Sequence, residues 1–216
     1  MLSALLLWLY NRREDAQAGQ EAARVLSQLE SMLETQGKEQ AEAAEPGDGS
    51  RQAGEEELPV KVVDGYGYIG YVEIPALERK LPVMSQWDYE RLKIAPCRQS
   101  GSSYTDDLVI AAHNYKSQFG GLKNLDTGDT VIFTDMNGVA NTYRVEKRET
   151  IEPEDVDAVL NSGYDLVLYT CTLGGETRVA VFCERAETGT EKASLPSAFF
   201  APFCTIFACD LPLILS

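Results

Sequence analysis

The middle of the chain consists of short runs in which apolar and polar residues alternate, separated by turn residues. A period of two is typical of strands, because successive side chains point to opposite faces. Many short strands with turns between them indicate a mostly β domain, a barrel or a sandwich, over residues 58–190. The expected strands are Gly67–Ile74, Leu81–Met84, Leu108–Ala112, Thr130–Thr134, Asn141–Thr150, Asp165–Thr170 and Thr177–Glu184.

Turn and helix signals fill the spaces between these runs. Met136-Asn-Gly-Val139 predicts a hairpin turn, since Asn-Gly tolerates positive φ at both central positions. Short helices are expected at Asp88–Lys93 and at Pro153–Asn161, where proline suits a first helical position.

Residues 14–57 have a different pattern. Ala22, Val25 and Leu29 recur at helical spacing, so we expect a helix over 14–43, followed by an acidic linker with almost no large apolar residue. Two interpretations stay open for this helix. It is a stalk that holds the domain off a membrane, or a solvated helix that packs on the domain.

The two ends of the chain are apolar. The run Met1–Tyr10 spans about 15 Å as a helix, half a bilayer core, so residues 1–13 are expected to be a partial membrane anchor that begins upstream. An interfacial segment and a cleaved signal peptide are the alternatives, and Arg12 and Arg13 conflict with a simple N-inside topology. Residues 191–216 contain three prolines, which make a poor spanning helix; a membrane-interacting tail, a strap over the core and an unordered end stay open.

The charge is strongly negative and unevenly placed. The net charge is −15, and the segment from Glu14 to Glu57 carries twelve acidic against three basic residues. An acidic surface repels phosphate backbones, which argues against nucleic-acid binding. The five cysteines show no C-x-x-C spacing and there is one histidine, so no zinc site is expected.

Chemistry is concentrated at two strand ends. If residues 173–176 form a four-residue hairpin loop, Cys171 lies directly opposite Arg178, on the same face of the sheet. A guanidinium beside a thiol favours the thiolate and can donate to an oxyanion. Parity puts Cys183 on the other face, as a buried structural cysteine. The apolar run before His113 delivers the one imidazole of the chain to another strand end, where it can serve as proton partner.

These residues in this order resemble the sortases. The signature is Leu168-Tyr-Thr-Cys-Thr172 with Arg178, joined by weaker matches such as Tyr71-Val-Glu-Ile-Pro75 and Leu125-x-x-Gly-Asp-x-Val131, and it covers about residues 67–185. His113-Asn-Tyr with Phe119-Gly-Gly-Leu is similar to class B, the compact loop 150–160 is similar to classes A and D, and Ala112 replaces the usual glycine. The class therefore stays open.

The resemblance implies a closed sortase-type β-barrel and a cysteine transpeptidase. Cys171 would attack a Leu-Pro-x-Thr-Gly-type sorting signal, Arg178 with backbone N–H groups near Thr172 would stabilise the oxyanion, and His113 would protonate the leaving amine. The thioacyl group would pass to an amine of a peptidoglycan precursor or a pilin. Besides Thr172, the implied substrate-binding residues are Thr170, Asn114 and Tyr115, although simple packing explains Tyr115 equally well.

The resemblance also implies partners and a location. Partners would be surface proteins that carry sorting signals, and the enzyme would sit on the extracytoplasmic face of the cell membrane through a single N-terminal anchor. No cofactor is expected. The alternative is a calcium ion bound near the acidic residues 149–157. A different explanation for two of these residues is that Glu154 and Asp155 stabilise the N-terminus of the short helix electrostatically.

Two other functions compete with this one. A papain-like thiol hydrolase places cysteine before histidine, whereas here His113 precedes Cys171. A non-catalytic, membrane-tethered β-barrel for adhesion or assembly would leave Cys171 merely buried.

Overall fold

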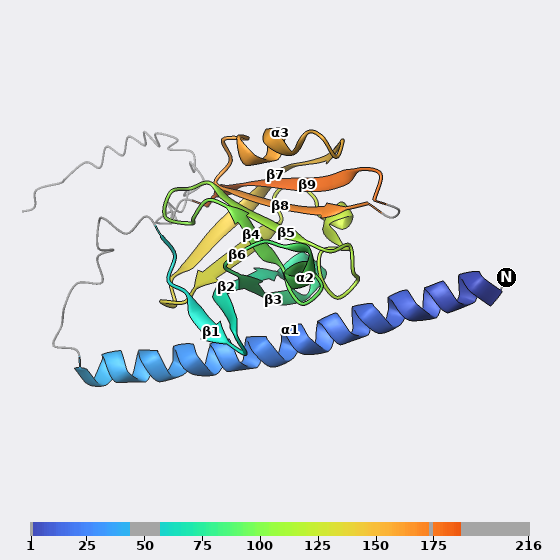
Figure 1. Ribbon diagram of the computed structural model, residues 1–216. Coiled ribbons are helices and arrows are strands. Elements are labelled where there is room, and N and C mark those ends of the chain that lie inside the picture. The colour runs from blue at the N-terminus through green and yellow to red at the C-terminus, as the bar shows by residue number, and fades with distance from the viewer. Residues whose placement is uncertain (1, 44–56, 173–174, 187–216) are drawn as a thin grey trace, which may run out of the picture. The chain divides into compact units, whose positions relative to one another are not determined.

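The computed structural model describes residues 2–43, 57–172 and 175–186 (Figure 1). The helices in this part of the chain are α1 (Leu2–Ala43), α2 (Tyr89–Leu92) and α3 (Val156–Leu160), with 3-10 turns η1 (Pro75–Leu77) and η2 (Leu122–Asn124). The strands are β1 (Lys61–Val63), β2 (Tyr66–Ile74), β3 (Arg79–Met84), β4 (Cys97–Ser100), β5 (Leu108–Ala112), β6 (Thr130–Asp135), β7 (Ala140–Ile151), β8 (Leu166–Cys171) and β9 (Arg178–Arg185).

Eight of these strands close into a barrel in the order β2-β3-β4-β5-β8-β9-β7-β6, and β6 pairs back onto β2 (Figure 1). The expected mostly β, closed-barrel fold is confirmed. The closing pair needs Gly70, which has φ +151° at a register shift in β2. A Cβ atom there would lie 2.0 Å from the carbonyl oxygen of Thr134, so no side chain fits.

All seven expected strands are present, with ends that differ by at most two residues. The pattern missed β1 and β4, which have three and four residues and are too short for alternation to stand out. The hairpin at 136–139 is also present, but its turn type differs. Only Gly138 takes positive φ, and the Asp135 carboxylate accepts from the N–H groups of Asn137 and Val139. The turn is therefore stabilised by the Asp135 side chain, and it does not have the positive φ at both central residues that we expected.

Strand alternation divides the apolar side chains between the barrel interior and its outer surface. Leu108 and Ile110 of β5 belong to the interior cluster together with Leu166 and Leu168 of β8. Val109 belongs instead to an outer cluster with α3. Residue parity along β5 and β8 therefore decides which side chains reach the outer surface.

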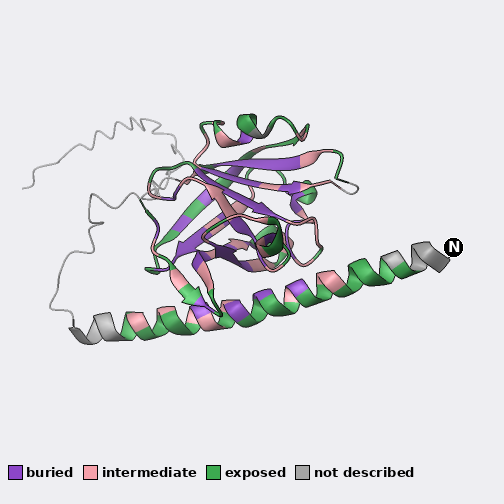
Figure 2. Ribbon diagram, in the orientation of Figure 1, coloured by how far each residue is buried: buried purple, intermediate pink, exposed green. Residues whose placement is uncertain are grey.

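Helix α1 covers another part of the outer surface. Its residues Ala22, Val25 and Leu29 are buried, while most of the opposite face is exposed (Figure 2). Val25 and Leu29 pack into one cluster with Tyr68 and Met84 of the barrel. Of the two interpretations for residues 14–43, the helix packed on the domain is the one that these contacts show. The helix begins at Leu2, without a break between the expected anchor and the expected stalk.

No helix in the described part of the chain combines the length and apolarity that crossing a membrane requires. Residues 44–56 of the acidic linker lie outside the described residues, and so does the whole apolar tail, 191–216, with Cys204 and Cys209.

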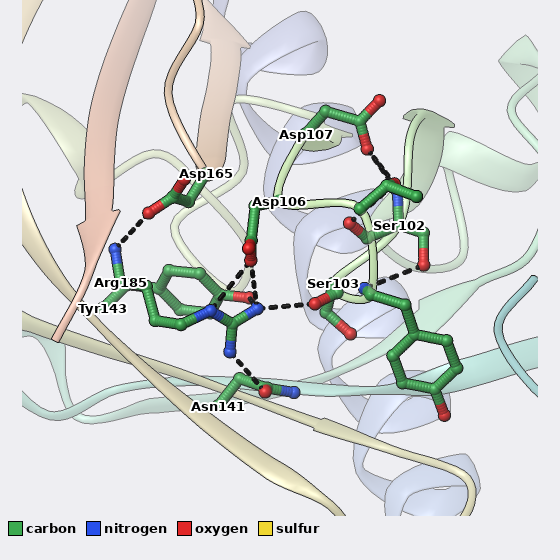
Figure 3. Close-up of polar contacts among 10 residues, drawn as sticks. Ser102, Ser103, Asp106, Asp107, Asn141, Tyr143, Asp165 and Arg185 are labelled. Carbon is green, nitrogen blue, oxygen red and sulfur yellow. Dashed lines mark hydrogen bonds and ion pairs between the residues drawn. The ribbon is translucent and has the colours of Figure 1, made fainter. Parts of the chain in front are cut away.

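The last residue of β9 connects the strand to the loop before β5. The Arg185 guanidinium forms an ion pair with Asp106, its Nε lying 2.8 Å from Oδ1, and donates to Asn141 and to the carbonyl of Ser103 (Figure 3). It also lies over the ring of Tyr143, 5.1 Å from the centroid. These contacts fasten the end of the barrel at which β5 and β8 begin.

Candidate active site

The hairpin of β8 and β9 brings Cys171 and Arg178 together. The two are direct cross-strand partners, as the loop length predicted. Thr172 and Thr177 close the hairpin: the Thr172 N–H donates to the Thr177 carbonyl at 2.9 Å, and the Thr177 N–H donates to the Thr172 hydroxyl at 3.1 Å. Cross-strand partners of this kind have Cβ atoms about 5 Å apart on one face.

Strand β5 brings His113 to the same place. It runs parallel to β8 with Ala112 beside Thr170, so the next residues along the two strands are His113 and Cys171. The even-numbered residues of β5 and β8 face the interior, so His113 and Cys171 both lie on the outer face. Three adjacent strand ends therefore carry His113, Cys171 and Arg178 in one row.

The imidazole of His113 is half-buried and has defined contacts. Its backbone N–H donates to Oε1 of Gln118 at 3.0 Å, and its ring stacks on Tyr115 with centroids 4.8 Å apart. Burial lowers the pKa of His113, Lys93 lowers it further, and Glu14 opposes this by raising it. At neutral pH the ring is therefore mostly unprotonated, in the form that can accept a proton.

The three described cysteines have different surroundings, and all three are free thiols. Cys97 and Cys183 are completely buried, and burial raises the pKa of each thiol to about 12. Neither can supply a thiolate near neutral pH. Cys171 is only partly buried, so it is the one of the three that a substrate can reach. Cys183 faces the interior, as its parity predicted.

The guanidinium of Arg178 lies over the hairpin turn. Its Nη1 donates to the carbonyl oxygens of Gly175 at 3.1 Å and Thr177 at 3.2 Å. A guanidinium has five N–H donors and Nη1 carries two of them, so these contacts hold the group while Nε and Nη2 supply further donors. Backbone N–H groups near Thr172 were the other expected oxyanion donors. The N–H of Thr172 itself donates to the Thr177 carbonyl in this structure.

Of the four expected substrate-binding residues, Thr170 lies in β8 and Thr172 follows the last residue of that strand, in the hairpin. Thr170 is 3% exposed, and its hydroxyl donates to the carbonyl oxygen of Ala112 at 2.9 Å. The expectation that it lines a cleft is therefore wrong, because its strand position points it into the barrel. The hydroxyl of Thr172 is bonded within the hairpin.

The other two residues follow His113 directly. Asn114 lines a cavity of about 350 Å³ at the barrel end, together with Arg79, Lys116 and Gln118. Tyr115 does not line this cavity. Its ring lies on His113, and its hydroxyl donates to the Glu14 carboxylate of α1 at 3.2 Å.

Sequence reasoning missed Gln118. It is 1% exposed, accepts from the His113 N–H, and donates through Nε2 to the carbonyl of Leu92 at 3.3 Å. A buried glutamine must have such partners, but in the sequence it stands in a polar stretch that looks like an ordinary loop. The contact of Glu14 with Tyr115 was missed for another reason, since the two residues lie 101 positions apart in the sequence.

No group of three or more metal-ligating side chains is found within residues 2–43, 57–172 and 175–186. The acidic residues near α3 therefore form no such group there. Helix α3 begins at Val156, and the side chain of Asp155 makes no capping hydrogen bond.

The barrel is similar to solved sortase structures. A sortase C of Streptococcus pneumoniae, in a structure described for catalysis and pilin substrate specificity, matches with a TM-score of 0.52 at 21% identity, over 76% of this chain and 96% of that one. A lid mutant of sortase A from Corynebacterium diphtheriae matches at 0.50 and 18%, over 77% and 97%. Sortase C1 from Streptococcus suis matches at 0.49 and 25%, over 58% and 76%. At these identities the first two likenesses concern the fold.

A family comparison covers the site itself. No curated protein matches the chain. The model of the sortase domain matches residues 72–186, just over half of the chain, and this range includes all of β5, β8 and β9. The family predicted from the cysteine, arginine and histidine strands is therefore confirmed: the chain belongs to the sortases, a family of cysteine transpeptidases.

Proposed function

We propose that this protein cleaves a Leu-Pro-x-Thr-Gly-type sorting signal through a thioacyl intermediate on Cys171 and transfers the acyl group to an amine. One observation carries the proposal: Cys171 and Arg178 are direct cross-strand partners, and the parallel register of β5 and β8 puts His113 beside them. A nucleophile, a cation and a proton carrier then share one face of the sheet.

The reaction begins with the thiol. His113, largely unprotonated because burial lowers its pKa, accepts the proton as the Cys171 sulfur attacks the scissile carbonyl. The N–H groups of Arg178 stabilise the oxyanion that forms. When the carbon–nitrogen bond breaks, the imidazolium returns its proton to the leaving amine, and a thioester remains.

An amine completes the transfer. It loses a proton to His113 as it attacks the thioester, and Cys171 leaves as the thiol. The donors in this proposal are surface proteins with sorting signals, and the acceptor is an amine of a peptidoglycan precursor or of a pilin. Such substrates meet at the outer side of a cell membrane, so the proposal places the enzyme there, held by its N-terminal segment.

The test uses the full chain, a sorting-signal peptide, and the same reaction with and without triglycine, followed by mass spectrometry. We expect a thioacyl adduct on the wild type, an amide product when triglycine is present, and neither with Cys171→Ala. Arg178→Ala and His113→Ala should remain folded, as circular dichroism would show, and lose ligation.

Three outcomes would contradict this function. Ligation by Cys171→Ala would exclude the assigned nucleophile. A wild type that forms no adduct with any of several motif variants would favour a non-catalytic module. Hydrolysis that triglycine never diverts to an amide would indicate a thiol peptidase.

A further inference from the structure

Helix α1 reaches the loop that carries His113. The Asp15 carboxylate accepts from the Ser117 N–H at 2.9 Å, and the Asp15 carbonyl accepts from the Ser117 hydroxyl at 3.0 Å. One turn later, a Cβ on Gly19 would lie 3.0 Å from the Cβ of Ser117. Helix and loop are therefore in close contact at this point.

The helix also reaches the histidine ring through Tyr115. Its hydroxyl donates to the Glu14 carboxylate, and its ring stacks on His113 at an interplanar angle of 26°. The barrel holds the backbone of the histidine through Gln118. Backbone contacts leave the rotation of the ring free, so Tyr115 is a contact that restricts it.

We propose that Glu14 and Asp15 of α1 are positioning residues, which hold the ring of His113 toward Cys171 through Tyr115 and Ser117. This inference rests on the proposed function, in which His113 carries the proton. It assigns α1 a part in the reaction that none of the strand residues supplies. The segment that precedes the catalytic domain in sequence would thus complete its active site.

Charge around the ring supports the same arrangement. Glu14 faces it from α1 and Lys93 from the end of α2, while Cys171 and Arg178 lie on the adjacent strands. A cavity of about 180 Å³ lies between α1, the end of α2 and Tyr115, and both Glu14 and Lys93 line it. Glu14 favours the protonated ring and Lys93 disfavours it, so the loss of Glu14 should lower the pKa of His113.

The single histidine of the chain makes a direct test possible, since an NMR titration of the full-length protein shows one imidazole. We expect a lower His113 pKa in Glu14→Ala and an unchanged one in Glu34→Ala. Glu34 lies on the same helix and is exposed, and its replacement by alanine removes the same charge as Glu14→Ala. Equal pKa values in wild type and Glu14→Ala would overturn the electrostatic part of the proposal.

The rate of acylation tests the positioning part. Glu14→Ala and Tyr115→Phe should each slow single-turnover acylation about three- to tenfold, the effect of one hydrogen bond. The double variant should be no slower than either single one, because both remove the same contact. Glu14→Gln can still accept from Tyr115, so it should restore most of the rate without restoring the pKa. If the rate losses of the two single variants add up in the double variant, or if Tyr115→Phe acylates at the wild-type rate, the positioning part of the proposal is wrong.

The two proposals can fail separately. If the wild type forms no acyl-enzyme, the proposed function is wrong, and the titration still decides whether Glu14 acts on the histidine. If the wild type acylates normally while both single variants match it in rate and pKa, the function stands and the role of α1 is wrong.

Discussion

Replacing Leu29 by alanine tests whether α1 belongs to the folded domain. Leu29 is completely buried between the helix and the barrel, in the cluster that contains Tyr68 and Met84. The substitution leaves helix propensity intact, since alanine is the best helix former, so its effect reports packing.

The expected loss follows from the buried volume. Truncation of a fully buried leucine costs about 2–5 kcal/mol. The lower half of that range applies here, because α1 has one free side and can move inward to fill part of the space. About 2–3 kcal/mol corresponds to a fall in Tm of about 4–12 °C for a protein of this size.

Calorimetry of the full chain gives the Tm, and urea unfolding gives the free energy of unfolding. Met32→Ala is the matched control, because Met32 is 37% exposed on the same helix, and its loss should stay within about 0.5 kcal/mol. Two results would contradict our interpretation of the packing: the same Tm for Leu29→Ala and Met32→Ala, or a separate unfolding transition of α1 before that of the barrel. Either result would mean that the helix is a stalk.

Three further predictions concern the site. Thr170→Val removes the hydrogen bond to Ala112 and should lower the free energy of unfolding in urea by about 1 kcal/mol; an unchanged midpoint would show that this bond contributes nothing between β5 and β8. Arg178→Lys keeps the charge but loses the planar fork, so kcat for ligation should fall about tenfold or more, with KM for the donor peptide little changed; full activity would mean that charge alone suffices. The pKa of His113 is lower in the folded protein than in the unfolded chain, which binds protons more readily as pH falls through about 6.5. The stability of the wild type relative to His113→Gln should therefore decrease between pH 7.5 and 5.5, and an equal difference at both pH values would contradict the assigned burial.

Local rules were enough to predict the core of the site. A four-residue loop put Cys171 opposite Arg178, and the apolar run before His113 marked its strand end. The same parity argument would have placed Thr170 inside the barrel, since neighbours of Cys171 on its strand must face the other way. That error came from extending a family pattern past the residues that the geometry supported.

Other features had no signal in the sequence. The hydrogen bonds that Ser117 donates to Asp15 join segments 102 positions apart, and nothing in either segment indicates the other. In the hairpin turn at Asn137, the Asp135 carboxylate accepts hydrogen bonds from the turn, and Asn137 does not take the positive φ that Asn-Gly favours. Parallel pairing of β5 with β8, which brings His113 to Cys171, depends on a chain crossing that periodicity does not reveal.

The length of α1 has a mechanical consequence. Twelve helical residues, Leu2–Arg13, precede Glu14 without a break, and at 1.5 Å each they extend about 18 Å along the axis. A stiff rod of this kind transmits rotation as well as distance, unlike a loose tether. Whatever grips the first turns of the helix would therefore fix both how far the row of His113, Cys171 and Arg178 stands from the point of attachment and which way it faces.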